Sequence, residues 1–315
     1  MSSKVPVSLI VDDGGVVNMF YFHHMAVEHE FRIPVSFTRK FAALCKANGI
    51  RGKFSIVPMP AGLGRLDEKK VARIPAGHIR SHIREMKKNI EGDFSITPEI
   101  LTHFMAYDLW KNRFTLTNEE AYFSNLPAEK ISDYVGLALE ILCNLGFTPA
   151  GVTSPWQCGL DNEENYAKGI GMAFRKVMKK DRSFYFLHCS GELLTPKIMC
   201  NSPETGKVIT IPGTVSDPFY GTNLPATAAK AVKHTKKMLD CLLTEDGKKG
   251  VIRELFEKKL PINIITHWQN LFSDGRLIGL AGLGELAERI NRTFGKEIQW
   301  MNFEELAETW DYSEK

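Results

Sequence analysis

Two adjacent carboxylates, Asp12 and Asp13, follow the apolar run SLIV and precede Gly14 and Gly15. An ordinary turn from a strand into a helix needs at most one Asp, as a helix cap. Adjacent carboxylates repel each other, so the pair indicates that one of them has another partner, such as a metal ion or a proton. Glycines would let the backbone pass close to an ion or a substrate. A simple helix cap and turn is the alternative interpretation.

Polar and ionisable residues also follow other apolar runs of the chain. In a (β/α) barrel, functional groups gather at the carboxyl ends of the strands. The recurrence of such residues therefore predicts one active site that is built from the ends of several strands. The residues in question are Glu99 and His103 in EILTH, the segment TSPW (153–156), Asp217 in SDPF and His267 in ITH.

The elements that would position these residues alternate between short apolar strands and amphipathic helices. Most of the apolar segments are β-branched or aromatic and apolar on both faces, which is typical of buried parallel strands. Several helical segments end at Asn-Gly or Leu-Gly just before a strand, as a helix that ends at a C′ glycine does. The expected strands cover residues 5–13, 52–58, 93–99, 150–156, 183–189, 207–214, 262–268 and 297–303, and the expected helices cover 36–49, 129–146, 163–180, 226–243 and 282–295.

Seven or eight β/α alternations in one chain predict a barrel with parallel strands and outer helices rather than an open sheet. The sequence has no Pro/Ser-rich linker and no internal repeat, so residues 1–315 are expected to form a single domain. We interpret residues 60–92 or so as an insertion that forms a loop and a helix over one end of the barrel.

Composition argues against several classes of function. The chain has 40 Lys and Arg against 37 Asp and Glu, and this near balance gives no support to binding of nucleic acid or of a membrane surface. Its 6 scattered cysteines include no CxxC pair, which argues against a structural zinc site and a disulfide scaffold. No apolar stretch approaches the roughly 18 residues of a membrane span, and the N-terminal apolar run is too short for a signal peptide. We therefore expect a soluble, cytoplasmic protein.

The ordered residues at the strand ends resemble the motifs of the polysaccharide deacetylase superfamily, the metal-dependent carbohydrate esterases with an incomplete (β/α)7 barrel. The resemblance implies an incomplete or distorted (β/α)7-type barrel for this chain. LIVDDGG resembles the first motif, which implies that Asp12 is the general base and that Asp13 binds the metal. EILTH resembles the second motif, in which two His ligands lie four residues apart. Here Glu99 stands in place of the first His, and His103 is the second.

Two further motifs have counterparts later in the chain. The third motif is Arg-x-Pro-aromatic, and TSPW keeps Pro155 and Trp156 but has Thr153 in place of the Arg. The segment ITH resembles the fifth motif and implies that His267 is the catalytic acid. The fourth motif has no clear match, although Asp217 lies at a suitable place in the order.

The resemblance implies that an acyl group is removed from an amide or ester by metal-activated water. A divalent ion on three protein ligands with open positions lowers the pKa of bound water and stabilises an oxyanion. The implied ligands are Asp13, Glu99 and His103, and zinc is the favoured ion. Two carboxylates and one His form a harder ligand set than one Asp and two His, so Mn, Fe, Co and Mg become stronger competitors. Asp12 would take a proton from the water, and His267 would donate one to the leaving group.

The substrate implied by the resemblance is a small carbohydrate-like molecule. Two other functions are left open: a glycoside hydrolase of the same superfamily, which would use paired carboxylates, and a sugar-binding barrel without turnover, which the missing Arg at Thr153 favours. Trp156 and Trp268 could stack on a sugar ring or lie in the core. The expected substrate-binding residues are Pro155, Trp156, Asp217 and Trp268.

Some of the candidate residues have structural interpretations as well. Glu99 could be a first-turn helix residue after Pro98, and such a helix would place Glu99 and His103 on one face. His267 could be a core histidine with one hydrogen bond. Asp274 in FSDGR is interpreted as a turn residue.

Other histidines compete for the role of metal ligand. His78 and His82 in HIRSH fit the two-His spacing better than EILTH does, but they fall on a basic helix that we expect to be exposed. His23 and His24 lie beyond the end of the first strand, and either of them could approach the site.

Overall fold

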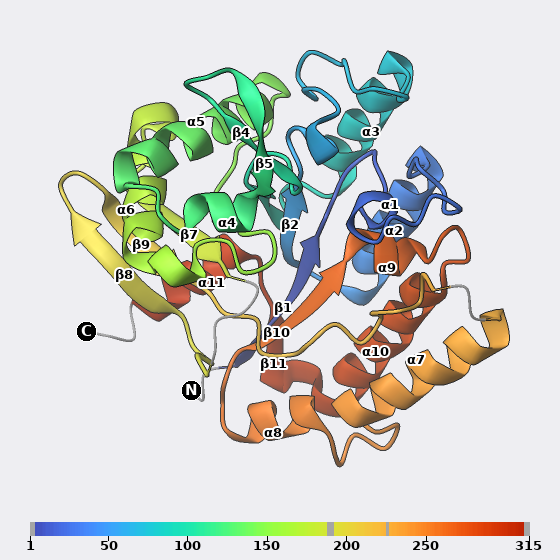
Figure 1. Cartoon of the computed structure of the whole chain (residues 1–315). Coiled ribbons are helices and arrows are strands. Elements are labelled where there is room, and N and C mark those ends of the chain that lie inside the picture. Colours follow the sequence, from blue (N-terminus) through green and yellow to red (C-terminus); the bar gives the residue numbers. More distant parts are fainter. Residues whose placement is uncertain (1–3, 188–191, 225–226, 312–315) are drawn as a thin grey trace.

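The structure is a computed structural model that describes residues 4–187, 192–224 and 227–311, and its strands form two main sheets (Figure 1). In the first sheet the strands run parallel in the order β10 (Ile262–His267), β1 (Val5–Asp12), β2 (Gly52–Ile56) and β3 (Phe94–Pro98), and β11 (Ile298–Trp300) pairs with the start of β1. In the second sheet β6 (Gly151–Thr153), β7 (Arg182–Phe186) and β9 (Gly206–Thr210) run parallel, and β8 (Lys197–Ser202) is antiparallel at the edge.

The two sheets are connected at two places. Glu99, just after β3, forms a parallel bridge with Thr153 of β6, and Val215 forms one with Ile264 of β10. The expectation of parallel strands with helices outside them is confirmed. Closure into a (β/α)7 barrel stays a prediction, because in the described part of the chain the sheets meet at isolated bridges rather than along continuous ladders.

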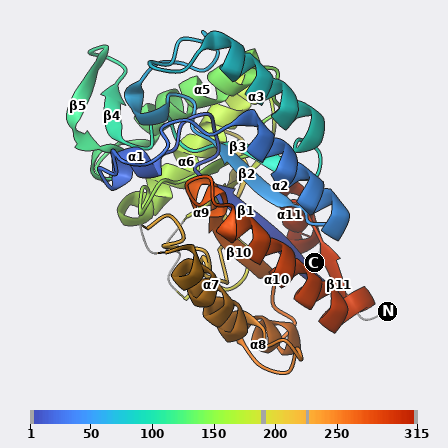
Figure 2. The ribbon, with the colours of Figure 1, turned by 90° about the vertical axis from the view of Figure 1, so that its right-hand side faces the viewer.

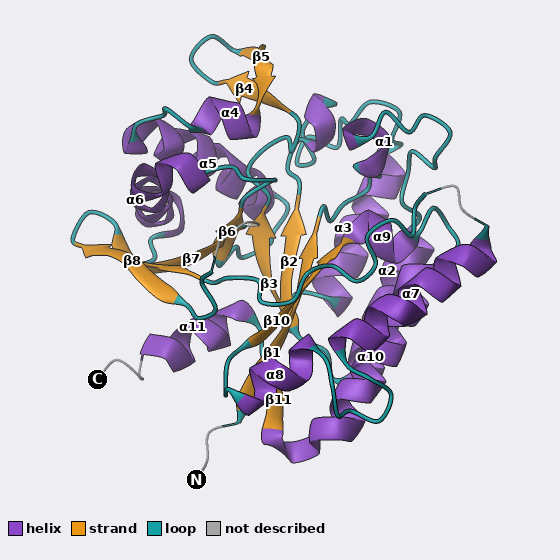
Figure 3. Ribbon diagram, turned by 60° about the horizontal axis from the view of Figure 1, so that its bottom comes forward, coloured by secondary structure: helices purple, strands orange, loops and turns teal. Residues whose placement is uncertain are grey.

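Helices pack on the outside of the strands (Figure 3). Figure 2 shows α3, α2 and α10 side by side over the first sheet, with α7 next to α10. The longer helices are α2 (Val35–Asn48), α3 (Ala76–Asn89), α5 (Ala128–Asn144), α6 (Glu163–Ala173), α7 (Ala228–Leu242), α8 (Val251–Glu257), α10 (Ile278–Phe294) and α11 (Phe303–Asp311). The short ones are α1 (Phe20–His23), α4 (Glu119–Phe123) and α9 (Trp268–Phe272), and single turns lie at Pro60–Gly62, Leu160–Asn162, Phe174–Met178 and Gly295–Glu297.

All eight expected strands and all five expected helices are present, with ends that differ by a few residues. The last expected residues of the strand at 183–189 lie partly outside the described residues. Residues 60–92 contain α3, which connects β2 to β3 and packs on α2, so this helix belongs to the layer of outer helices. A segment that the sequence analysis missed is the hairpin of β4 (Met105–Asp108) and β5 (Arg113–Asn118), which projects from the molecule in Figure 2.

An apolar cluster fills the space between the two sheets. Ile10 of β1 and Ile265 of β10 meet Phe184 and Phe186 of β7, and Phe303 of α11 joins them. Helix α11 lies at the amino-terminal ends of the strands, where the Glu304 amide donates to the Ser95 hydroxyl at 3.1 Å. This packing closes one end of the interior and leaves the carboxyl ends of the strands for the site. Among the described helices, none combines the length and the apolar character that a membrane span needs.

A charged pair lies inside this arrangement, between the strands. The ammonium group of Lys53, on β2, donates to the carboxylate of Asp12, at the end of β1, and both side chains are almost completely buried. The same ammonium donates to the hydroxyl of Thr153 at 2.7 Å and lies 4.8 Å from the centre of the Phe186 ring. Lys53 therefore connects strands of both sheets.

Replacing Lys53 with Met should destabilise the protein by about 3–5 kcal/mol, because a buried carboxylate loses its cation. The double substitution Lys53→Met with Asp12→Asn should recover much of that loss, since no buried charge is left without a partner. Urea unfolding of the three proteins measures both effects. A single variant within about 1 kcal/mol of the wild type would contradict this account of the pair.

Candidate functional site

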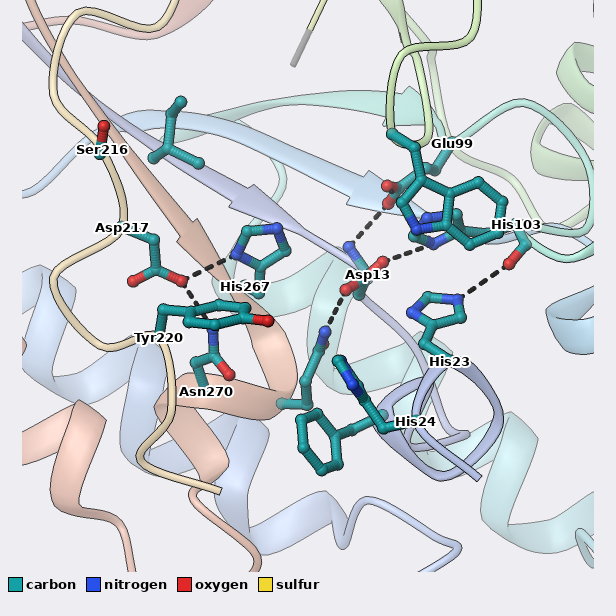
Figure 4. A pocket seen from close by; sticks show the side chains of 14 residues that line it. Asp13, His23, His24, Glu99, His103, Ser216, Asp217, Tyr220, His267 and Asn270 are labelled. Carbon is teal, nitrogen blue, oxygen red and sulfur yellow. Dashed lines mark hydrogen bonds and ion pairs between the residues drawn. The ribbon is translucent and has the colours of Figure 1, made fainter. Parts of the chain in front are cut away.

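A cavity of about 610 Å³ lies at the carboxyl ends of β1, β3 and β10 (Figure 4). Asp217, His267 and Tyr220 lie on one side of Asp13, and His23 and His103 lie on the other. The full lining consists of Asp13, Phe20, His23, His24, Glu99, His103, Trp156, Ser216, Asp217, Tyr220, Ile265, His267, Gln269 and Asn270. The prediction that ionisable residues from several strand ends meet in one place agrees with this lining.

Asp13, His23 and His103 form a group that could hold a metal ion. Each offers one ligand atom, and these atoms lie within 4.8 Å of one another. The nearest pair is Asp13 Oδ1 and His103 Nδ1, at 2.5 Å. His103 Nε2 is buried and has no hydrogen-bond partner among the described residues. One carboxylate and two imidazoles are a donor set that suits a divalent transition metal, and zinc in particular.

The two side chains beside His103 are oriented by further hydrogen bonds. His23 Nε2 donates to the carbonyl oxygen of His103 at 2.9 Å, which leaves the lone pair on His23 Nδ1. Metal-binding histidines commonly donate their other ring N–H to a carbonyl in this way, because it fixes the tautomer. The amide of Gln269 donates to Asp13 Oδ2, so the other carboxylate oxygen, Oδ1, faces His103.

Glu119 holds the loop that carries His103. Its carboxylate accepts hydrogen bonds from the backbone amides of Leu101, Thr102 and His103, at 3.2, 2.8 and 2.8 Å, and from the hydroxyl of Tyr134 at 2.8 Å. Glu119 is fully buried at the start of α4. Four donors on one carboxylate fix the backbone of the loop, and so fix the place of His103.

Glu99 lies next to the metal-binding group and outside it. Its Oε2 accepts from the backbone amide of Asp13 and from the hydroxyl of Ser55, both at 2.6 Å, and its Oε1 is 3.6 Å from His103 Nδ1. Residues 99–103 form a loop and not a helix, so the i, i+4 spacing does not place Glu99 and His103 as equivalent ligands. His23 completes the group in the position that the sequence analysis gave to Glu99.

Burial and neighbouring charges set the protonation of these groups. Burial raises the pKa of Asp13, but the charge and hydrogen bond of His103, together with the charges of His23 and His267, outweigh it and hold that pKa well below its usual range. Burial and the charge of His103 lower the pKa of His23 to about 3, so this ring is neutral. Burial opposes the charge of His103, but Asp13 and Glu99 together raise its pKa to about 9. An ion bound at these atoms would therefore displace a proton from His103.

The backbone is strained where the chain turns into the cavity. Asp13, His103 and Trp156 have φ angles of 61°, 49° and 47°, in the left-handed region that side-chain-bearing residues seldom adopt. Gly14 is needed for a different reason, because a Cβ there would lie 2.0 Å from the carbonyl oxygen of Ser55. Such strain persists only where the surrounding structure enforces it, and it gathers at functional sites. The first glycine of DDGG is therefore explained by the close passage of its backbone against β2.

His267 and Asp217 form a second polar unit across the cavity. His267 Nδ1 donates to Asp217 Oδ2 at 2.8 Å, and the Asn270 side chain donates to the same oxygen at 2.7 Å. Burial lowers the pKa of His267, but the hydrogen bond and charge of Asp217, with the charges of Asp13 and Asp12, raise it to about 10. A protonated imidazole that faces a cavity can donate a proton to a leaving group.

Three of the predicted residues lie away from the lining: Asp12, Pro155 and Trp268. Asp12 is buried beneath the cavity and pairs with Lys53. Trp268 is completely buried among Phe37, Phe41 and Phe54, and its indole N–H donates to a backbone carbonyl. The structure corrects the expectation that Trp268 binds the substrate: α9 begins at this residue, and its ring packs into the core.

Pro155 is buried immediately before Trp156, and Trp156 does line the cavity. The ring of Trp156 lies 4.5 Å from that of His103 and 5.1 Å from that of His23, between centres. The predicted aromatic wall is therefore made by Trp156 without Trp268.

The competing histidines of HIRSH are elsewhere. His82 is fully buried between α3 and α2, with Nδ1 3.4 Å from the hydroxyl of Thr38, and His78 Nε2 donates to the Ile33 carbonyl at 2.8 Å. The expectation that this helix face is exposed is wrong for His82. Asp274 accepts from the Glu30 amide at 2.8 Å, away from the cavity lining, which agrees with its interpretation as a turn residue.

Sequence patterns did not predict Gln269, Asn270 or Glu119, and they made His23 only a secondary candidate. The signal for the first two was their place directly after ITHW, at the end of a strand with other site residues. Glu119 lies behind a hairpin that the sequence did not predict, so no spacing connects it to His103. His23 belongs to the short helix α1, whose only sequence signal is two adjacent histidines.

The sequence matches no protein-family model and no curated protein. One solved structure, entitled "Crystal structure of Puue Allantoinase", is similar to it with a TM-score of 0.52 and 13% sequence identity. The similarity covers 99% of this chain and 91% of the other one. At this identity the comparison shows a shared fold, and the fold extends over the whole chain rather than over one part of it.

We expect the purified protein to bind about one Zn²⁺ per chain, and His103→Ala and His23→Ala to abolish that binding, because each removes one of three ligands. Elemental analysis after dialysis against zinc measures it. His24→Ala is the matched control: His24 is adjacent and lines the cavity but is not in the metal-binding group, so this variant should keep its zinc. Full zinc content in His23→Ala would contradict the ligand set and return Glu99 to consideration.

Proposed function

We propose that the protein is a metal-dependent hydrolase that cleaves an amide or ester bond with water. The observation that carries the proposal is that one cavity brings a group of metal-binding type, Asp13, His23 and His103, opposite a hydrogen-bonded His267–Asp217 pair. The first could hold an ion next to the reacting carbonyl group, and the second could deliver a proton to the leaving atom. Neither unit alone distinguishes a hydrolase from a binding protein.

Two further observations support this proposal. The order of motifs resembles that of the polysaccharide deacetylases, whose members are metal-dependent hydrolases. The solved structure of similar fold is entitled an allantoinase, so an enzyme with this fold exists. Removal of an acyl group from a carbohydrate is one reaction within the proposed class, and the substrate could equally be another amide or ester.

In the proposed reaction, a bound divalent ion would supply a Lewis acid that makes water a stronger nucleophile and stabilises negative charge on the carbonyl oxygen. Glu99 takes a proton from the attacking water, because its carboxylate lines the cavity and burial raises its pKa to about 7, beside the charges of its neighbours. The water oxygen bonds to the carbonyl carbon, and the bond from that carbon to the leaving nitrogen or oxygen breaks. His267 donates its proton to that leaving atom.

This assignment differs from the one that the motif resemblance implies. The resemblance makes Asp12 the base and Glu99 a ligand, whereas the cavity contains Glu99 and not Asp12. Asp12 already accepts from Lys53, which would have to be displaced before Asp12 could approach a substrate. We therefore propose that Asp12 and Lys53 support the strand end and that Glu99 takes the proton.

Turnover of simple amides and esters tests the proposal. The zinc-, manganese- and cobalt-loaded protein should hydrolyse at least one member of a set that contains 4-nitroacetanilide, 4-nitrophenyl acetate, N-acetylglucosamine and allantoin. Glu99→Gln should lower kcat by about 10²–10⁴-fold while the zinc content is kept, which separates a base from a ligand. Loss of zinc in Glu99→Gln would show that Glu99 is a ligand, and no turnover of any substrate with any of the metals would overturn the proposal.

The pH dependence of kcat should report on His267. In the wild type the proton donor is charged below a pKa of about 10, so activity should fall as the pH rises through that value. Asp217→Asn removes the negative charge that helps to raise this pKa, so the falling limb should move to lower pH. Ser216→Ala, a change of the neighbouring lining residue, should leave the limb in place. An unmoved limb in Asp217→Asn would exclude His267 as the group that titrates.

A further inference from the structure

The cavity has an unusual charge pattern for an enzyme site. Among the described residues, its lining includes no Lys and no Arg, whereas it includes the carboxylates of Asp13, Glu99 and Asp217. Sites for carboxylate or phosphate substrates generally use Arg or Lys to pair with the anion. Away from the metal-binding group, the positive charge that the described lining offers is that of His267, which is already paired with Asp217, so an anionic substituent on the substrate would compete with a carboxylate for it.

Aromatic and apolar side chains line other parts of the cavity. Trp156 stands over His103, and Phe20 stacks on His24 with ring centres 4.2 Å apart. Ile265 and Tyr220 lie on the side of His267. The reacting end of the cavity is thus polar, and its other surfaces suit a flat or apolar group.

Exposed apolar side chains follow cavity-lining residues in two segments of the chain. Tyr220, which lines the cavity, is 59% exposed, and Leu224 follows it in the same loop at 49%. Met25 comes directly after His24 and is 76% exposed, and Val27 is 68% exposed. Single exposed apolar residues are ordinary, but a group at the mouth of a cavity indicates a binding surface.

The two segments that carry these residues are held together. His29 Nε2 donates to the carbonyl oxygen of Asn223 at 2.7 Å, and the Asn223 side chain donates to Asn270 of the lining. The His29 ring also lies 5.0 Å from that of Phe20, between centres. These contacts place residues 20–29 and 220–224 next to each other beside the cavity. We call the exposed apolar residues of the two segments, Met25, Val27, Tyr220 and Leu224, the apolar rim.

Resting on the proposed function, we propose that the substrate is an amide or ester without a carboxylate or phosphate group, and that its substituent beyond the reacting bond is aromatic or alkyl and binds against the apolar rim. An anionic substituent would find no Lys or Arg in the described lining and would compete with Asp217 for His267, and the rim supplies the surface for the apolar one. A substrate of this kind is smaller and less polar than a polysaccharide.

Hydroxamates test this inference independently of turnover, because the hydroxamate group binds a divalent ion and the rest of the molecule probes the cavity. Titration calorimetry on the zinc-loaded protein would compare acetohydroxamate, benzohydroxamate and 4-carboxybenzohydroxamate. We expect benzohydroxamate to bind at least about tenfold more tightly than acetohydroxamate, since it buries a phenyl ring. The added carboxylate should weaken binding by about tenfold, because the described lining offers it no Lys or Arg and places it among the carboxylates of Asp13, Glu99 and Asp217.

Tyr220→Ala should reduce the ratio of the first two affinities to about twofold, since the ring loses its contact at the rim. Leu116→Ala is the matched control, because Leu116 is 97% exposed on the β4–β5 hairpin and outside the lining, and it should leave the ratio unchanged. Equal binding of acetohydroxamate and benzohydroxamate, or tighter binding of the carboxylated probe, would overturn this inference and leave the metal site intact. Failure of all three probes to bind would instead count against the proposed function.

Discussion

Burial of negative charge is the constraint on which the rest of the structure depends. Asp12, Asp13, Glu99 and Glu119 lie close to the ends of β1 and β3, and all are almost inaccessible to solvent. A buried carboxylate is tolerated only if it has a cation or hydrogen-bond donors as partners. Each of these carboxylates has different partners, and those partners determine the arrangement of the site.

The partners of the four carboxylates indicate a different role for each. Asp12 has an ammonium group, Glu119 has backbone amides and a phenol hydroxyl, and Glu99 has one amide and one hydroxyl on a single oxygen. Asp13 alone is paired chiefly with an imidazole, which a metal ion can replace as its partner. The two Asp residues of DDGG thus differ because their side chains point to different neighbours, one to β2 and one to the cavity.

The sequence was sufficient for the strands, because their apolar, β-branched runs between helices leave few alternatives. It also placed Asp13, His103, Trp156 and His267 in one region, since the carboxyl ends of parallel strands converge. It failed where local conformation decides the direction of a side chain. Pro98 indicated a helix start, yet the bridge of Glu99 to Thr153 extends the strand instead, and the i, i+4 relation to His103 then has no meaning.

Site residues that lie outside the strand ends were harder to predict from the sequence. His23 comes from one turn of helix in a loop, and Glu119 follows a hairpin whose residues are mostly exposed, so neither has the periodicity that sequence patterns detect. Trp268 shows the converse error. A residue next to a site histidine faced the core because a helix begins there, and adjacency in sequence did not imply adjacency in the site.

The hairpin also has a consequence for how this chain can change. Its two ends are fastened at one place, since the Glu119 amide donates to the Phe104 carbonyl at 3.1 Å while the Glu119 carboxylate grips the amides up to His103. The chain therefore enters and leaves the hairpin of residues 105–118 at one place. Insertions, deletions or a new binding surface at the turn of residues 109–112 can be accommodated without moving His103. Strand β4 is more constrained, because the Tyr107 amide donates at 3.1 Å to the Tyr134 hydroxyl, which in turn donates to Glu119.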